Sequence, residues 1–312
     1  MAVRPLAGVA KTRPLLRVGC VSVDDVSAPR YAAFLSSLES LGFEQGQNLD
    51  FEFVRVSSPN ERGFSLGWAE VIQRDINMLL ADGPEACLTA AIKVSGSLPI
   101  VMVANGFDPI AKKYISNGSG VSENLTGLYS PTELTAKRLQ LLKDTLPDLT
   151  AATIFWDQFS ADQWQTIQPA AASLGIRLHG VELHDAPYDF EAALDQVPPD
   201  SRGSLVVLDS PNFAQPVLRR LPAFALRHGI PSMFANRAFV TEGGLLSYGP
   251  NVTETYKAAA EYVNRLARGE PVSSVPAQRS TQFEFSVNLS TAKKLGIVLP
   301  LSVTARADHL FS

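Results

Sequence analysis

Apolar runs and helical stripes alternate along the first half of the chain. The run LLRVGCVSV at 15–23 is typical of a strand buried on both faces of a parallel sheet. A helix is predicted to follow it, because Pro29 suits a first turn, Phe34 and Leu38 share one face, and Gly42 supplies a stop. Further strands are predicted at NLDFEFV, NMLLA and PIVMVA, with helices at 65–76 and 86–94. Such alternation predicts crossover connections and a parallel sheet.

The same alternation begins again after NLTGLYSP at 124–131. Ser130, Pro131 and Glu133 predict an N-cap, a first-turn proline and a capping-box acceptor for a helix that reaches Leu146. Strands are predicted at AATIFW, IRLHGVEL, SLVVLD and PSMFA, with helices between them. Two such series predict the fold class: α/β, with two doubly wound parallel-sheet lobes.

The late segment 243–271, GGLLSYGPNVTETYKAAAEYVNRLARGEP, predicts a strand and a long helix capped by Asn251 and Glu254. If the second lobe is complete by Gly244, this strand and helix return to the first lobe, and FEFSVN then returns to the second. The chain would cross between the lobes near 127, 244 and 280, which makes a three-strand hinge about which the lobes open and close. The predicted boundaries are 15–127 plus 245–279 for the first lobe, 128–244 plus 280–312 for the second, and an extension or leader at 1–14.

Composition is that of an ordinary globular protein, with 46% hydrophobic and 19% charged residues. A net charge of -4 gives no electrostatic attraction to nucleic acid or to anionic membranes, so neither is expected as a partner. The four histidines are scattered without the spacing of a metal site, and no cofactor is expected.

Motifs for chemistry are missing from the sequence. It contains no Gly-x-Ser-x-Gly elbow, no P-loop and no dinucleotide fingerprint. Two alternatives to a binding protein are an α/β enzyme, for which we can assemble no nucleophile, and the ligand-sensing core of a regulator. The second alternative needs a helix-turn-helix segment, for which residues 1–14 are too short.

Six segments in order carry a resemblance to a known family: LGFEQGQNLDFEF, NLTGL, ELTAKRLQLLKDTLP, EGGLLSYGPN, YVNRLARGEP and FEFSVNLSTAKKLGI. Together they resemble the ABC-transporter substrate-binding proteins that include the tryptophan/tyrosine-binding lipoproteins. The resemblance implies a type I periplasmic-binding-protein fold, a small ligand between the lobes, no catalysis and a permease as partner. We expect a monomer. An aromatic amino acid or related amphipathic metabolite is the expected ligand. The resemblance also implies a periplasmic or membrane-tethered extracellular location, although no apolar export signal is visible in the opening residues.

Ligands of open α/β sheets collect at the carboxyl ends of the strands, so the candidate contacts are read from those ends. In the first lobe they are Ser22, Asp24, Glu85, Asn105 and Asp108, and in the second they are Trp156, Asp157, Asp209, Phe213, Arg237 and Phe239. Tyr129 and Tyr248 lie near predicted crossings, in the cleft or at the hinge. The aspartates either meet a ligand amine or cap local turns, and the aromatic residues either stack on a ligand or pack internally. Arg237 is the expected partner of a ligand carboxylate.

The turn after the third strand departs from the pattern of the proteins that this chain resembles. Their Gly-Thr-Pro-like turn can hold a carboxylate, whereas this chain has Pro84, Glu85 and Ala86. A glutamate at a helix N-terminus already interacts with the helix dipole and would repel a second anion. We therefore expect the cleft to favour a ligand that carries an amine.

Overall fold

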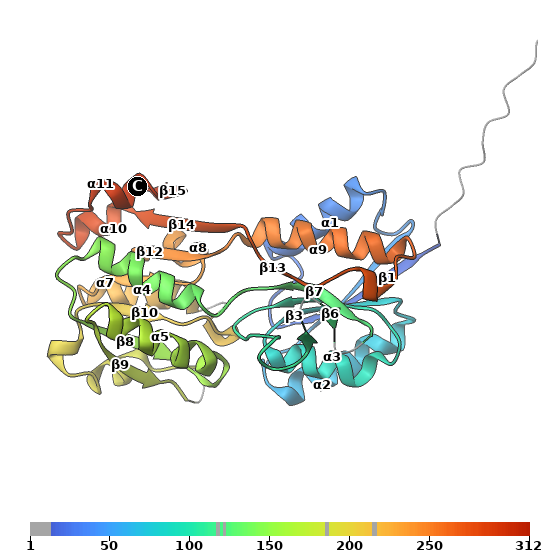
Figure 1. The fold of residues 1–312 in the computed structure, drawn as a ribbon, viewed down its shortest axis with the longest axis horizontal. Helices are drawn as coiled ribbons and strands as arrows, with labels where there is room; N and C mark the ends of the chain where they lie inside the picture. Colours follow the sequence, from blue (N-terminus) through green and yellow to red (C-terminus); the bar gives the residue numbers. More distant parts are fainter. Residues whose placement is uncertain (1–13, 117–118, 121–122, 185–186, 214–216) are drawn as a thin grey trace, which may run out of the picture.

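Two α/β lobes lie side by side and are connected by several passes of the chain (Figure 1). The computed structural model describes residues 14–116, 119–120, 123–184, 187–213 and 217–312. Each lobe has a mostly parallel sheet with helices on both faces, so the fold class predicted from the sequence is confirmed. Residues 1–13 of the predicted leader lie outside the described residues.

The first lobe contains a six-stranded parallel sheet in the order β13-β7-β4-β3-β1-β2. Its strands are β1 (Leu16–Ser22), β2 (Leu49–Arg55), β3 (Met78–Gly83), β4 (Ile100–Ala104), β7 (Leu125–Tyr129) and β13 (Gln278–Arg279). Two further short strands, β5 (Ile115–Ser116) and β6 (Ser119–Gly120), pair with each other antiparallel. Its helices are α1 (Pro29–Ser40), α2 (Glu61–Val71), α3 (Glu85–Ser95) and α9 (Val252–Ala267). Helices α1 and α9 cover one face of the sheet, and α2 and α3 cover the other.

The second lobe contains a seven-stranded sheet in the order β15-β14-β12-β11-β10-β8-β9, in which only the β12–β14 pair is antiparallel among the described strands. Its strands are β8 (Ala151–Trp156), β9 (Arg177–Glu182), β10 (Leu205–Val207), β11 (Ser232–Phe234), β12 (Leu246–Pro250), β14 (Phe283–Asn288) and β15 (His309–Phe311). One face carries α4 (Leu134–Thr145), α5 (Ala161–Ser173), α10 (Leu289–Lys294) and α11 (Leu301–Thr304). The other carries α6 (Phe190–Asp195), α7 (Val217–Arg227) and α8 (Arg237–Thr241).

The chain passes between the lobes after β7, after β12 and after β13 in the described part of the structure (Figure 1). The predicted return of the strand LLSYG to the first lobe is wrong, because β12 pairs with β11 through Met233 and Leu246 and with β14 through Ser247 and Ser286. Only the following helix, α9, returns and packs on α1. The second crossing therefore comes after Pro250 rather than near 244, and the other predicted boundaries stay a prediction.

The predicted caps of two helices have different outcomes. Asn251 caps α9 as predicted, since its side-chain oxygen accepts a hydrogen bond from the Glu254 amide at 3.1 Å. The capping box predicted at Ser130 is wrong, because α4 begins later and its N-cap Glu133 makes no side-chain capping bond among the described residues. Ser130 instead donates its amide to the Ala104 carbonyl at 3.1 Å, and so belongs to the crossing that continues β7.

None of the helices in the described ranges combines the length and the hydropathy needed to cross a bilayer.

Candidate ligand-binding site

The carboxyl ends of the two sheets meet, and we call this region the lobe interface. Gly106 follows β4, and a Cβ built on it would lie 3.4 Å from Gln163 Nε2 and 3.8 Å from the Asp209 carbonyl oxygen in the second lobe. Lys112 of the first lobe places its Nζ 3.5 Å from Asp162 Oδ2 of the second. Strand ends from both lobes thus lie within contact distance, at the edge where open α/β sheets bind ligands.

A partly buried ionic cluster forms the first-lobe side of this edge. The Arg30 guanidinium pairs with Asp24, and its Nε lies 3.6 Å from Asp82 Oδ2. Tyr31 donates its hydroxyl to Asp82 at 2.7 Å, and the rings of Tyr31 and Tyr256 lie 5.2 and 5.9 Å from the guanidinium carbon. Burial raises the pKa values of both tyrosines, and the negative charge of Asp82 raises them further. Both phenols therefore stay protonated at neutral pH, and Tyr31 uses its proton in the hydrogen bond to Asp82.

A second arginine, Arg138 of α4, lies buried on the second-lobe side. Its Nε donates to the Tyr248 carbonyl at 2.7 Å, and its Nη1 is 3.4 Å from Thr135 Oγ1. Burial lowers its pKa to about 10, against the opposing influence of Asp209 and Tyr248, so the side chain is still charged at neutral pH. Burial also raises the pKa of Asp209. The positive charges of Arg138 and of Arg30 in the other lobe lower this pKa, whereas the negative charge of Asp157 raises it. The electrostatic environment of Asp209 thus includes an arginine from each lobe.

Asp157 organises the loops at the carboxyl ends of β8 and β10. Its Oδ2 accepts hydrogen bonds from Ser210 Oγ at 2.5 Å, Tyr188 Oη at 2.7 Å and Asn212 Nδ2 at 3.1 Å. Its Oδ1 accepts from the Phe159 amide at 3.0 Å. With only 1% of its surface exposed, Asp157 is committed to this network, which fixes the loop that follows Asp209.

Most of the predicted contact residues lie near the strand ends, but many of their polar groups already have local partners. Ser22 accepts from the Asp24 amide at 3.3 Å, Asn105 donates its amide to the Gly83 carbonyl at 3.0 Å, and Asp108 caps a turn through the Ile110 and Ala111 amides. Tyr129 packs into the first-lobe core, and Tyr248 supplies the carbonyl that holds Arg138. Their role as ligand contacts stays a prediction.

Glu85 lies at the N-terminus of α3, as expected, but its carboxylate is already paired. Tyr114 donates its hydroxyl to Glu85 Oε1 at 2.9 Å, and Lys112 Nζ lies 3.2 Å from Oε2. Because Lys112 also approaches Asp162, Glu85 contributes to a contact between the lobes. Its charge is therefore partly neutralised before any ligand arrives.

Four predicted contact residues have partners within the second lobe instead. Trp156 stacks on Trp164 with ring centroids 5.8 Å apart, against the core beneath α4 and α5. Phe213 and Phe239 are 4% and 6% exposed and belong to the core under α7 and α8, so they pack internally rather than present a surface to a ligand. Arg237 is bonded to Glu284 and His309, at 3.2 and 2.9 Å from its Nη1, so this guanidinium already has a carboxylate partner.

Arg30, Asp82 and Arg138 are absent from the sequence-based candidates. Arg138 has a recognisable signal, because it lies four residues after Leu134 and four before Leu142, on the apolar stripe of its helix. A lone arginine on such a stripe must find a buried partner. Asp82 is the last but one residue of the apolar strand β3, whereas Arg30 lies in an ordinary first helical turn and gives no comparable signal.

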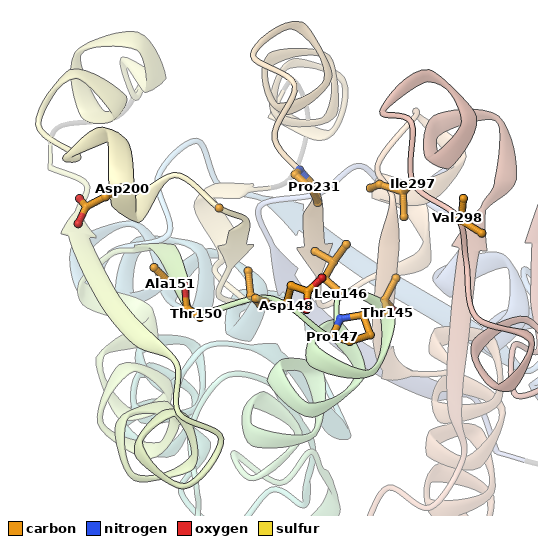
Figure 2. A pocket seen from close by; sticks show the side chains of 12 residues that line it. Thr145, Leu146, Pro147, Asp148, Thr150, Ala151, Asp200, Pro231, Ile297 and Val298 are labelled. Carbon is orange, nitrogen blue, oxygen red and sulfur yellow. The ribbon is translucent and has the colours of Figure 1, made fainter.

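Two surface hollows lie away from the lobe interface. One has a volume of about 420 Å³ and lies at the amino ends of β8 and β10 (Figure 2). It is lined by Thr145, Leu146, Pro147, Asp148, Leu149, Thr150, Ala151, Asp200, Gly203, Pro231, Ile297 and Val298. The other, of about 400 Å³, lies between α6 and α7. All of their lining residues among those described come from the second lobe, so neither hollow can be closed by movement of the lobes.

No group of three or more His, Cys, Asp or Glu side chains that could hold a metal ion is found in the described ranges. The interface instead gathers charged groups and hydrogen-bonding donors, which bind and orient small polar molecules.

Solved structures with the same architecture come from several bacteria. A conserved domain protein from Vibrio cholerae O1 biovar El Tor has a TM-score of 0.84 at 20% identity, covering 95% of this chain and 99% of the other. An ABC domain from Streptococcus pneumoniae in complex with L-Trp has a TM-score of 0.83 at 15% identity, covering 95% and 100%. The ligand-free, open structure of a substrate binding protein with adhesive properties from Clostridium difficile has a TM-score of 0.69 at 19% identity, covering 96% and 100%. None of the curated proteins matches the chain in sequence.

The two sheets, the crossings and these neighbours define a type I periplasmic binding protein fold. The family model of the ABC transporter substrate binding proteins matches residues 21–311. The chain therefore belongs to that family.

Proposed function

We propose that this protein captures a small solute at the lobe interface and delivers it to the permease of an ABC importer. The observation that carries the proposal is the meeting of strand ends from two lobes that are connected only by crossing segments, in a chain that belongs to the substrate binding family. The proposed mode of action is binding without catalysis. A periplasmic or membrane-tethered extracellular location and a monomeric state form part of the same proposal.

The proposed mechanism is a shift in population between open and closed arrangements. A ligand at the interface touches both lobes only when they are closed, so it stabilises the closed arrangement by its differential affinity. The Lys112–Asp162 contact belongs to that arrangement. The chain resembles the L-Trp complex more closely than the ligand-free open structure, at comparable identity, which supports interpreting its own arrangement as closed.

A small amphipathic metabolite is the proposed ligand, with an aromatic amino acid as the first candidate. The L-Trp complex among the neighbours supports this choice. The chemistry of the interface supports it too, because groups of both charges, Arg138 and Asp209, approach the same edge.

We expect ligands of this class to stabilise the protein without being altered. At a concentration one hundred times Kd, a ligand adds about 2.7 kcal/mol to the free energy of unfolding, which is a readily detected thermal shift. Thermal-shift screening of amino acids and related metabolites should therefore yield hits, and mass spectrometry of each incubated hit should recover the compound unchanged. Conversion of a hit to a product would instead favour an enzyme with the same fold.

A further inference from the structure

Arg138 is a buried cation without an ionic partner. Only 3% of its surface is exposed, and no carboxylate of the described residues lies within 4 Å of its guanidinium. Two of its five N–H donors have acceptors there, namely the Tyr248 carbonyl and the Thr135 hydroxyl. A buried charge that lacks a counter-ion costs several kcal/mol, so such a group usually has a functional reason.

The surroundings of Arg138 hold the guanidinium at the edge of the second sheet. The Tyr248 carbonyl fixes its Nε, and Gly249 follows on the same strand, with its Cβ position 3.7 Å from Nη2. A Cβ at Gly249 would also lie 1.9 Å from the Ala235 carbonyl oxygen, so glycine is required where β12 and β11 approach each other. The guanidinium is thus held in place by a backbone carbonyl and a hydroxyl rather than by a carboxylate.

Asp209 is the matching anion. Its amide and carbonyl are bonded to Gln163 at 3.1 and 2.8 Å, whereas its carboxylate has no hydrogen bond or ion pair within the described ranges. Arg138 influences its ionisation without forming a direct pair with it. The second-lobe edge therefore presents one cation and one anion, each available to a partner of opposite charge.

The first-lobe edge is a poor place for a ligand anion. Asp24 and Asp82 surround Arg30, and Glu85 lies at the N-terminus of α3. The cations at that edge, Arg30 and Lys112, are already paired with these three acidic groups. At Arg138 an incoming carboxylate would instead meet an unpaired guanidinium in a low-dielectric setting, where charge-assisted hydrogen bonds are strongest.

We infer that Arg138 binds the anionic group of the ligand and that Asp209 binds a neighbouring cationic or hydrogen-donating group. The inference deepens the proposed function and rests on it. The ligand class is a small carboxylate, recognised from the second lobe, for which an adjacent amine or hydroxyl adds affinity. Accordingly, Arg138 makes a carboxylate necessary for ligand binding, and Asp209 makes the site discriminate among ligands that carry a carboxylate.

Probes matched in shape and different in charge test this inference. One trio is L-tryptophan, tryptamine and indolepropionate, and a second is L-phenylalanine, phenethylamine and phenylpropionate. Thermal shift on the full chain identifies which members bind, and isothermal titration measures their Kd. The variants are Arg138→Gln, Arg138→Lys and Asp209→Asn, with Lys137→Gln as the control, because Lys137 is the exposed neighbour on the same helix and loses the same charge.

We expect the wild type to bind the members that carry a carboxylate and not the two amines. Arg138→Gln should raise Kd at least tenfold, Arg138→Lys should raise it less, and Lys137→Gln should leave it within twofold. Asp209→Asn should reduce the advantage of the amino acid over the carboxylate that lacks an amine. All variants are first checked for a cooperative thermal transition, and the lysine variant keeps the test open if the glutamine variant fails to fold.

Two results would overturn this inference while leaving the proposed function in place. One is an unchanged Kd for carboxylates in a folded Arg138→Gln protein, and the other is wild-type binding of the amines in preference to the carboxylates. Binding of neither trio by the wild type would count against both the inference and the ligand class proposed above.

Discussion

Gly127→Ala is expected to destabilise the first lobe by more than about 3 kcal/mol, because the new methyl group has no room and the backbone is unfavourable. Gly127 has φ 129° in the middle of β7, in register with Met102 of β4. A Cβ would lie 2.1 Å from the Met102 carbonyl oxygen and 2.6 Å from its amide nitrogen. These are backbone atoms, so no side-chain rotation relieves the overlap, and β7 must move away from β4.

Urea unfolding measures this effect, followed by tryptophan fluorescence in a Trp156→Phe, Trp164→Phe background in which only Trp68 of the first lobe reports. Gly96→Ala is the matched control, since Gly96 has φ 54° but no atom within 4 Å of its Cβ position. That variant carries only the backbone strain, about 1–3 kcal/mol. Equal midpoints for the two variants would contradict the expectation. Because β7 leads directly into the first crossing, the strong variant is also expected to lose ligand binding.

Asp157→Ala is expected to cost about 2–4 kcal/mol and to weaken ligand binding. The substitution leaves Tyr188, Ser210 and Asn212 without the carboxylate that they share, inside a buried network. The loop that holds Asp209 is attached to that network through Ser210. Loss of the network should therefore reduce both the free energy of unfolding and the affinity for a carboxylate ligand.

Asp189→Ala provides the comparison for Asp157→Ala, since it removes an exposed aspartate of the same lobe. Asp189 accepts from the Glu191 and Ala192 amides at 3.1 Å as the N-cap of α6, and loss of such a cap costs about 0.5–2 kcal/mol. Denaturant unfolding and titration calorimetry on both variants separate the two roles. If Asp157→Ala were no more harmful than Asp189→Ala in either measurement, the organising role of Asp157 would be refuted.

The two sheets could be predicted from the sequence because their signals are local. Apolar strands such as β1 and β4 alternate with helices that end at recognisable glycine stops, and Asn251 caps α9 where its spacing to Glu254 indicates. The sheet to which β12 belongs could not be predicted in this way, because its pairing with β14 joins residues far apart in sequence. Likewise, residues 130–133 have the composition of a helix start but serve as a crossing segment.

The candidate site could be predicted as an edge but not as a set of contacts. Position after a strand places Phe213 and Phe239 among the candidates at the carboxyl edge of the second sheet, yet it does not reveal that their rings turn into the core. Aspartates at such positions look alike in sequence, and only the structure separates Asp157, with five donors around its carboxylate, from Asp209, whose carboxylate has none among the described residues. Arg138 lies in a helix rather than at a strand end, so a search of strand ends overlooks it.

Small-angle X-ray scattering with and without a saturating ligand tests the central claim most directly. If a small carboxylate closes the two lobes about their crossing segments, the radius of gyration and the maximum dimension should both fall when it binds, and they should not fall for Arg138→Gln at the same ligand concentration. Superimposable curves for the free and the saturated wild-type protein would contradict capture by closure.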